Sequence, residues 1–322
     1  MLGFILLLTA PLLIGGLVLS NVFGDDDDDD EVETEEPQIA TEQDVFLQPN
    51  EDGDFIGTDG VDILLADEEP SAFSGGTVLL GGGDDVALLG RRSGVFDVSE
   101  NAPTANVFGG DGDDRITNYS GGVTDGGAGD DIIESLANSN VRGGAGDDIL
   151  RLDATQLPRT FAQGGEFPGE DAILDAGPGA DRIELTTNYN GFNDLAGTAQ
   201  VTGGEGADTF IVNALNANYR DVGGTSGGGP DTVVDLIDIQ DFEPSEDKLV
   251  LRYEGAFGPP EMTFSVDPLP ATSDAPAGVI LTYETPTTPV DRPVRTSIIV
   301  RGAPDLTWDD IELERLRAGV VG

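Results

Sequence analysis

A nine-residue motif with glycine and aspartate at fixed positions recurs along the central part of this chain, and it restricts the possible folds more than any other feature. The pattern is G-G-x-G-x-D-x-U-x, where U is a large apolar residue. Repetition at a short period predicts a solenoid, in which each repeat contacts its neighbours and successive repeats build one continuous core. Four segments follow the pattern in full: Gly109–Thr117, Gly126–Glu134, Gly143–Arg151 and Gly203–Ile211.

Five further segments follow the pattern with one or more departures. They are Gly57–Leu64, Leu80–Leu88, Gly164–Leu174, Ala176–Glu184 and Ser226–Val234, of which the third carries the additional residues Phe167 and Pro168. The sixth-position aspartates of the nine copies are Asp62, Asp85, Asp114, Asp131, Asp148, Asp171, Asp181, Asp208 and Asp231.

Glycine and aspartate in this order indicate a turn that binds a metal ion. Glycine adopts positive φ angles and lets backbone carbonyls approach one another, so the first half of each copy is predicted to be a tight turn. Carbonyl and carboxylate oxygens are the ligands of a hard cation such as Ca²⁺, which takes about six to eight of them at about 2.3–2.6 Å, whereas Mg²⁺ demands stricter octahedral geometry. An ordinary glycine or Asx turn is the alternative interpretation of each copy.

The last three residues of each copy predict a short strand with one buried side chain. Such a strand cannot bury its apolar face alone, so the core must come from stacking successive coils. The residues predicted to point inward are Ile116, Ile133, Leu150, Ile173, Ile183, Phe210 and Val233. The fifth-position aspartates, such as Asp130, are expected to point toward solvent.

The spacing of the copies indicates how the coils are organised. Asp114, Asp131 and Asp148 follow one another at 17 residues, and we expect them to stack with Asp131 in the middle. The segments between these copies lack the Gly-Asp pattern, so only one edge of the solenoid is predicted to bind cations, while polar turns close the other. The longer intervals predict surface loops at Gly90–Thr104 and Asp153–Gln163.

The repeated motif resembles the RTX, or haemolysin-type, calcium-binding repeat over roughly Gly57 to Val234. The resemblance implies an all-β fold, a right-handed parallel β-roll, with several Ca²⁺ ions held between turns stacked on the same side. It also implies that the ligands are the sixth-position aspartates and the carbonyls of the glycine turns. The glycines of the complete copies are Gly109, Gly110, Gly112, Gly126, Gly127, Gly129, Gly143, Gly144, Gly146, Gly203, Gly204 and Gly206.

Composition excludes several classes of function. The 322 residues include 62 acidic and 15 basic side chains, for a formal net charge of −47, and neither Cys nor His. Without these two residue types the chain has no disulfide, no thiol nucleophile, no Ser-His-Asp triad and no thiolate or imidazole zinc site. The negative charge argues against nucleic acid as a partner, since phosphates require Lys and Arg.

The N-terminus predicts export from the cytoplasm. Residues Leu2–Phe23 contain no charged side chain and as a helix would span a bilayer core of about 30 Å. We therefore expect residues 1–24 to form one hydrophobic helix, a transmembrane anchor or, alternatively, a cleaved signal segment, although the basic region of such signals is missing. The acidic run in residues 25–44 predicts a disordered stalk. The remainder is expected to be extracytoplasmic, anchored at the cell surface or in the periplasm, or else secreted.

After the repeats, which we bound at residues 45–235, residues 236–322 are expected to form a β cap over the last coil. Val234–Leu251 resembles the segment that commonly closes RTX rolls, and Asp241 and Asp247 are candidates for a last cation site. Strands are predicted at Val279–Tyr283 and Thr296–Val300, and a strand or short helix at Leu306–Leu316. Aromatic bulk for the cap comes from Phe242, Phe257, Phe264 and Trp308.

The favoured function is a non-enzymatic, exported calcium-binding repeat protein that calcium folds outside the cytoplasm. Two alternatives remain open from the sequence. One is a calcium-stiffened adhesin that binds glycans or other cell-surface components. The other is a carboxylate-dependent enzyme acting on polysaccharide, in which Arg142, Arg151 and Arg182 would line a groove.

Overall fold

The computed structural model describes residues 45–51, 53–66, 76–89, 105–119, 122–136, 139–153, 173–188, 199–215, 233–254, 263–273, 275–284 and 295–316. Within them, two long sheets run side by side along the molecule. Sheet A runs in spatial order through β1 (Val45–Phe46), β3 (Asp62–Ala66), β5 (Val86–Leu89), β7 (Arg115–Asn118), β9 (Ile132–Leu136), β11 (Ile149–Asp153), β13 (Arg182–Asn188), β15 (Thr209–Leu215), β17 (Lys248–Glu254) and β21 (Glu312–Leu316).

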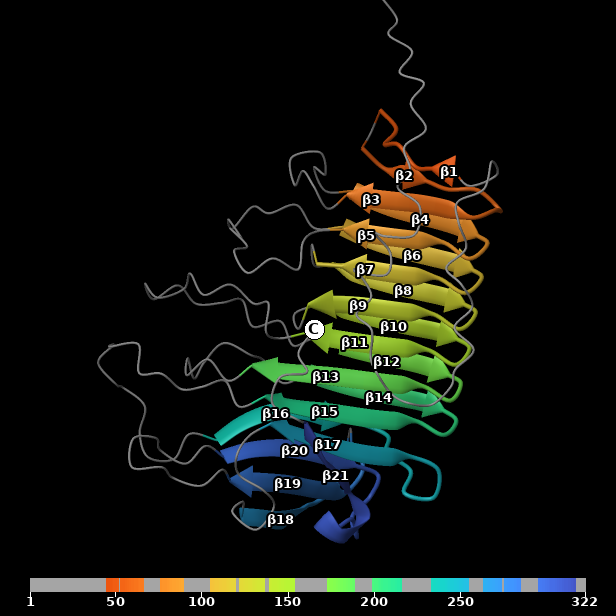
Figure 1. Cartoon of the computed structure of the whole chain (residues 1–322). Coiled ribbons are helices and arrows are strands. Elements are labelled where there is room, and N and C mark those ends of the chain that lie inside the picture. The colour runs from red at the N-terminus through yellow and green to blue at the C-terminus, as the bar shows by residue number, and fades with distance from the viewer. Residues whose placement is uncertain are drawn as a thin grey trace, which may run out of the picture.

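Sheet B is the second layer. It runs through β2 (Phe55–Ile56), β4 (Gly76–Gly82), β6 (Ala105–Asp111), β8 (Val123–Ala128), β10 (Asn140–Ala145), β12 (Ile173–Pro178), β14 (Ala199–Glu205), β16 (Val233–Ile239), β20 (Arg295–Arg301), β19 (Gly278–Glu284) and β18 (Thr263–Leu269). The two layers form a stack of coils in Figure 1, with strands of sheet A and sheet B pointing in opposite directions.

The chain alternates between the sheets, so each coil contributes one strand to each layer. A strand of sheet B leads through a glycine turn into a strand of sheet A, as β8 leads into β9. Neighbouring strands within each sheet of the repeat region pair in parallel, and β10 pairs with β8 so that Val141 lies beside Thr124, 17 residues earlier. This arrangement confirms an all-β parallel roll and the 17-residue stacking.

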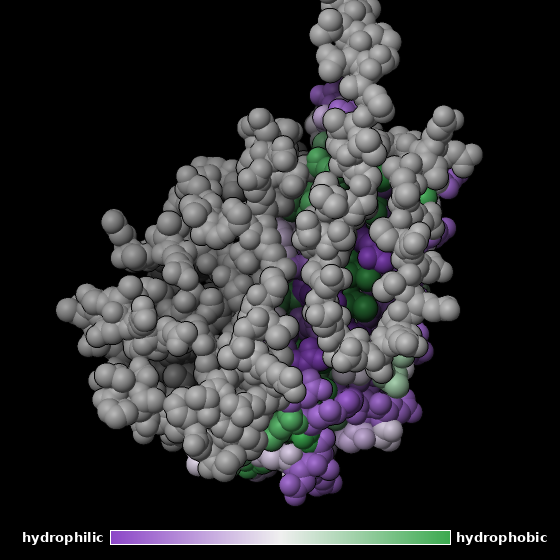
Figure 2. All heavy atoms as spheres, in the orientation of Figure 1, coloured by the Kyte–Doolittle hydropathy of each residue, from purple (hydrophilic) through white to green (hydrophobic). Residues whose placement is uncertain are grey.

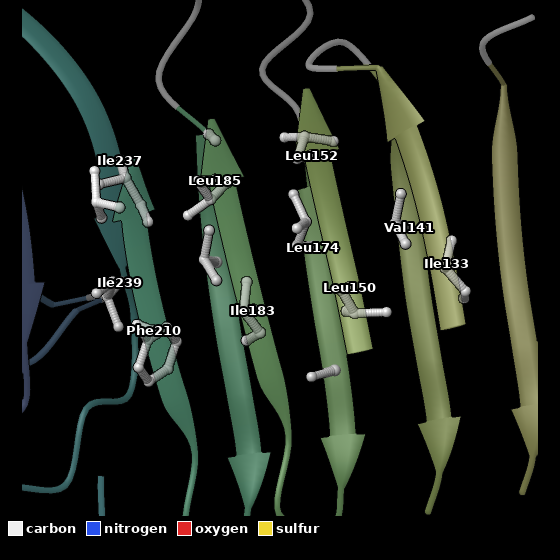
Figure 3. Close-up of a cluster of buried hydrophobic side chains, with 14 of the residues drawn as sticks. Ile133, Val141, Leu150, Leu152, Leu174, Ile183, Leu185, Phe210, Ile237 and Ile239 are labelled. Atoms are coloured by element: carbon white, nitrogen blue, oxygen red, sulfur yellow. The ribbon is translucent and has the colours of Figure 1, made fainter. Parts of the chain in front are cut away.

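The core lies between the two sheets and is built from one or two buried aliphatic residues per strand. Ile133, Leu150 and Ile183 of sheet A have no exposed surface, and they face Val141 and Leu174 of sheet B. Figure 3 shows these side chains in rows that continue from coil to coil, ending at Phe210, Ile237 and Ile239. Continuity of these rows is what lets strands of four to seven residues bury their apolar faces.

The prediction that Ile173 points inward is wrong. Ile173 is 49% exposed, and it begins β12 of sheet B instead of occupying the sheet A position of Ile133 or Ile183. Val233 also lies in sheet B, at the start of β16. Both residues therefore come before a turn of the ladder edge in their coil, and not after one. The ladder passes directly from Asp148 to Asp181 and from Asp208 to Asp247, so neither copy contributes a rung.

The C-terminal strands extend both sheets and end the stack. Strands β17 and β21 continue sheet A in parallel, whereas β19 pairs antiparallel with β20 and with the edge strand β18. The predicted strands at 279–283 and 296–300 correspond to β19 and β20, and the segment 306–316 contains the 3₁₀ helix Trp308–Asp310 followed by β21. In Figure 2, hydrophilic atoms predominate at this end of the roll, at the bottom of the view.

Aromatic side chains fill the cap as predicted. Phe242 is buried and its ring centroid lies 5.9 Å from that of Phe210, so it covers the end of the core. The rings of Phe264 and Trp308 lie 4.6 Å apart. Phe257 lies outside the described residues, as do nearly all of the predicted loops 90–104 and 153–163 and all of residues 1–44. In the described part of the chain, no helix is long and apolar enough to cross a membrane.

Two identical substitutions test this account of the core. Ile133→Ala should lower the free energy of unfolding by about 2–5 kcal/mol, since it opens a cavity between the sheets. Ile173→Ala removes a half-exposed side chain and should cost about 1 kcal/mol or less. Urea unfolding in excess calcium measures both. Equal losses for the two variants would contradict the assignment of Ile173 to the outer face.

Candidate metal sites in the glycine turns

Each turn requires glycine because adjacent coils approach one another there. Gly127 and Gly129 have φ angles of 118° and 135°, which L side chains rarely adopt. A Cβ atom on Gly127 would lie 2.1 Å from the carbonyl oxygen of Gly110 in the preceding coil, and one on Gly129 would lie 2.2 Å from the oxygen of Gly112. The second- and fourth-position carbonyls thus form two columns of oxygens along this edge of the roll.

The sixth-position aspartates stack into a continuous ladder along the same edge. The backbone amide of Asp114 donates to Oδ1 of Asp131 at 2.8 Å, and the amide of Asp131 donates to Oδ1 of Asp148 at 2.8 Å. The side chains of this ladder are almost fully buried up to Asp208. Its rungs in spatial order are Asp62, Asp85, Asp114, Asp131, Asp148, Asp181, Asp208 and Asp247.

The second oxygen of most ladder carboxylates is buried without a hydrogen-bond partner. This holds for Oδ2 of Asp85, Asp114, Asp131, Asp148 and Asp181. The Oδ2 atom of Asp131 points at Gly126, where a Cβ would lie 2.2 Å from it and 2.5 Å from the carbonyl oxygen of Gly143 in the next coil. Oxygens of two coils therefore converge beside the first glycine of the motif. A buried carboxylate oxygen without a donor is costly unless a cation or a proton balances it.

Burial and mutual repulsion raise the proton affinity of these carboxylates. The pKa of Asp85, Asp114, Asp131, Asp148 and Asp181 is raised to about 7. Burial is the largest cause, the amide hydrogen bond to Oδ1 opposes it, and the charges of neighbouring aspartates raise the pKa further. Burial likewise raises the pKa of Asp208. Some of these carboxylates are therefore protonated at neutral pH when no cation is bound.

The donor set fits a hard cation. Every atom available at this edge is an oxygen, from a carboxylate or a backbone carbonyl, as Ca²⁺ prefers. Among the described residues no group of three or more acidic side chains surrounds a single point, so each ion would depend on carbonyls for most of its ligands. The residues that would hold it are the ladder aspartates together with the glycines of the turns, and bound Ca²⁺ would supply the positive charge that the buried row lacks.

The structure places most of the predicted site residues at this one edge. The predicted glycines of all four complete copies lie in the stacked turns. Asp171 and Asp231 lie outside the described residues, and the ladder passes directly from Asp148 to Asp181 and from Asp208 to Asp247, with amide-to-Oδ1 distances of 2.8 and 3.0 Å. Asp247 is thus a rung of the ladder. It is the sixth residue of the segment that begins at Phe242, which is the position of the ladder aspartate in every repeat.

A second, exposed ladder involves the fifth-position aspartates. The amide of Asp130 donates to Oδ1 of Asp113 at 2.9 Å, and the amide of Asp147 donates to Oδ1 of Asp130 at 2.8 Å. The amides of this ladder donate to the preceding coil, whereas those of the buried ladder donate to the following one. Asp130 is exposed, as predicted, but its side chain still links two coils.

The arginines of the alternative enzyme hypothesis are paired with carboxylates. Arg142 lies 3.8 Å from Asp125 on the outer face of sheet B. Arg151 and Arg182 both contact Glu184, which is buried on sheet A. Burial alone would raise the pKa of Glu184, but these two guanidinium groups, with that of Arg252, hold it below its usual value. Glu184 is therefore poorly suited to donate a proton, as a glycosidase acid must.

Comparison with protein-family models and with curated proteins found no relative of this chain.

Stability without calcium should fall as pH rises. The pKa of Asp85, Asp114, Asp131, Asp148 and Asp181 is 3.8 in the unfolded chain and about 7 in the roll, so the folded state binds more protons between these values. The stabilisation is complete below about pH 4 and is lost as pH rises through 7. In calcium-depleted buffer the urea midpoint should therefore be clearly higher at pH 5 than at pH 8. Asp131→Asn should reduce this difference. A midpoint that does not change with pH would refute the buried, proton-binding row.

Proposed function

We propose that this protein is a non-enzymatic calcium-binding β-roll whose aspartate ladder binds several Ca²⁺ ions and thereby folds the repeat region. The observation that carries the proposal is the row of buried Oδ2 atoms without hydrogen-bond donors. For Asp114, Asp131 and Asp148 this oxygen lies beside a backbone carbonyl of the next coil. A divalent ion balances the charge of such a row and accepts carboxylate and carbonyl ligands from two coils at once.

Calcium that binds only the folded roll adds its binding free energy to the free energy of folding. The unfolded chain holds no preformed oxygen cage, so an ion that binds the roll alone stabilises it in proportion to its binding. Sites with one carboxylate per coil and neutral carbonyls otherwise should be weak individually, with a Kd on the order of 10⁻⁴–10⁻³ M, as in extracellular calcium modules. Because adjacent coils share the ladder, filling one site should favour the next.

We also propose that the roll works outside the cytoplasm. Sites of millimolar affinity need the calcium concentrations of extracellular fluids, and the uncharged segment Leu2–Phe23 is suited to export. Protease added to spheroplasts should remove the roll. Complete protection of the roll in spheroplasts, with digestion after lysis, would place it inside and contradict the proposal.

The absence of catalysis is the third element of the proposal. Its support is that the buried carboxylates of the described residues serve the ladder, or, for Glu184, an arginine cluster. The contacts Arg142–Asp125 and Arg151–Glu184 are consistent with ion pairs that join neighbouring strands, and Arg182 contacts Glu184 within β13.

Calcium titration followed by circular dichroism is the direct test. The wild-type chain at pH 8 should gain β signal as calcium is added and lose it in excess chelator. A β-rich spectrum that chelator leaves unchanged would overturn the proposal.

Two isosteric variants sharpen this test. Asp131→Asn keeps the Oδ1 acceptor for Asp114 but replaces the unpaired oxygen by an amide nitrogen that cannot bind Ca²⁺. At pH 8 without calcium it should stabilise the roll by on the order of 2 kcal/mol, because a buried charge is removed. With calcium it should raise the calcium midpoint several-fold. Asp130→Asn makes the same change at an exposed position and should shift neither quantity by more than a small fraction of this. Equal effects of the two variants would contradict the assignment of the ligand position.

A further inference from the structure

The two ends of the aspartate ladder differ from its interior at Oδ2, the oxygen that faces the first position of the motif. At the first rung Oδ1 of Asp62 is buried without a partner, because the described part of the ladder has no earlier rung whose amide could donate to it. At the first rung, the backbone amide of Thr58 donates to Oδ2 of Asp62 at 2.6 Å, and the Thr58 hydroxyl lies 3.1 Å from the same oxygen. At the last rung, the amide of Glu243 donates to Oδ2 of Asp247 at 2.8 Å. In both cases the donor lies four residues before the aspartate, at the second position of the motif. The chain itself thus supplies at both ends the donor that interior rungs lack.

The residue at the second motif position differs between the interior rungs and the two end rungs. In the six interior copies this residue is glycine with a positive φ angle between 108° and 127°. These glycines are Gly81, Gly110, Gly127, Gly144, Gly177 and Gly204. At the ends the second residue is Thr58 or Glu243, and no residue other than glycine has positive φ in the described part of the chain.

Backbone conformation explains the difference. A residue with a Cβ atom rarely takes positive φ, so the peptide preceding Thr58 is oriented differently from that preceding an interior glycine. Its N–H then points at the carboxylate four residues ahead. In the interior copies described above, Oδ2 of the five aspartates from Asp85 to Asp181 has no donor. Among the described rungs, it is therefore at these five that Oδ2, the oxygen beside the first motif position, is left for a cation.

We propose that the residue at the second motif position decides whether a coil binds calcium, and that the copies beginning at Gly57 and Phe242 bind none. Thr58 and Glu243 terminate the ion array by closing the end carboxylates with backbone donors. The array is then limited to the rungs from Asp85 to Asp208. This inference rests on the proposed calcium binding, and it restricts the candidate ligands, since Asp62 is a rung of the ladder but not a calcium ligand.

The N-terminal end offers a gain-of-site test. In the first copy, Oδ2 of Asp62 and the carbonyl oxygen of Leu80 in the next coil lie beside Gly57, as the matching atoms lie beside Gly126 in an interior copy. The first copy differs from the complete motif at its second position, where Thr58 stands in place of glycine. Thr58→Gly removes the hydroxyl and permits positive φ, and it should create one additional calcium site.

The experiment counts bound ions by equilibrium dialysis with radioactive calcium at saturation, on the full-length chain in mild detergent. Thr58→Gly should bind one ion more than the wild type, and the double variant with Asp62→Asn should return to the wild-type number. Asp59→Gly, which introduces a glycine at the neighbouring exposed position, should leave the number unchanged. Asp62→Asn alone should also leave it unchanged, whereas Asp131→Asn should lower it.

The outcomes separate this inference from the function it rests on. A wild-type chain that binds no calcium would overturn both. A wild-type chain that binds calcium, together with loss of an ion in Asp62→Asn, would overturn the inference alone. The same holds if Thr58→Gly keeps the wild-type β spectrum in calcium but binds no additional ion.

Discussion

A buried carboxylate in every coil is the constraint on which the rest of this structure depends. One oxygen of each carboxylate accepts the amide of the preceding coil, and so it sets the distance and register between coils. In the five rungs from Asp85 to Asp181 the other oxygen is buried and has no donor among the described residues. The contact that joins the coils therefore leaves a negative charge that the chain does not neutralise. Either a proton or a cation must do so.

The glycines make this arrangement sterically possible, and the aliphatic rows stabilise it. Carbonyl oxygens of one coil lie where Cβ atoms of the next would be, so side chains at those positions would push the coils apart. The core between the sheets is built from short strands, and those of sheet B such as β6 and β10 alternate inward and outward residues. Such a core is continuous only while successive coils stay in register. The turn edge and the core thus depend on each other.

The two edges of the roll differ in how far they accommodate inserted residues. Successive rungs of the ladder are separated by as few as 17 and as many as 39 residues, yet the hydrogen bond between them lies between 2.7 and 3.0 Å throughout. The additional residues enter the chain between a strand of sheet A and the next strand of sheet B, as between β11 and β12. Insertions are therefore confined to the edge that carries no ladder. On the outer face of sheet A, ion pairs such as Arg151–Glu184 join strands across one such insertion.

The sequence by itself determined the tight glycine turns, the short strands of stacked coils and the stacking of Asp114, Asp131 and Asp148, and its resemblance to RTX repeats implied the parallel roll. The turns and strands follow from local chemistry, because glycine spacing and the alternation of aliphatic residues act within a single coil. Tertiary structure decided which copies become coils. The motifs Gly164–Leu174 and Ser226–Val234 resemble the other degenerate copies, yet their residues Ile173 and Val233 begin strands of sheet B, and the ladder continues to Asp181 and Asp247. A rung is defined by its hydrogen bond to another coil, and that bond depends on how the intervening residues are accommodated. The local pattern holds no information about that, so only the folded stack distinguishes a turn in the ladder from a similar sequence outside it.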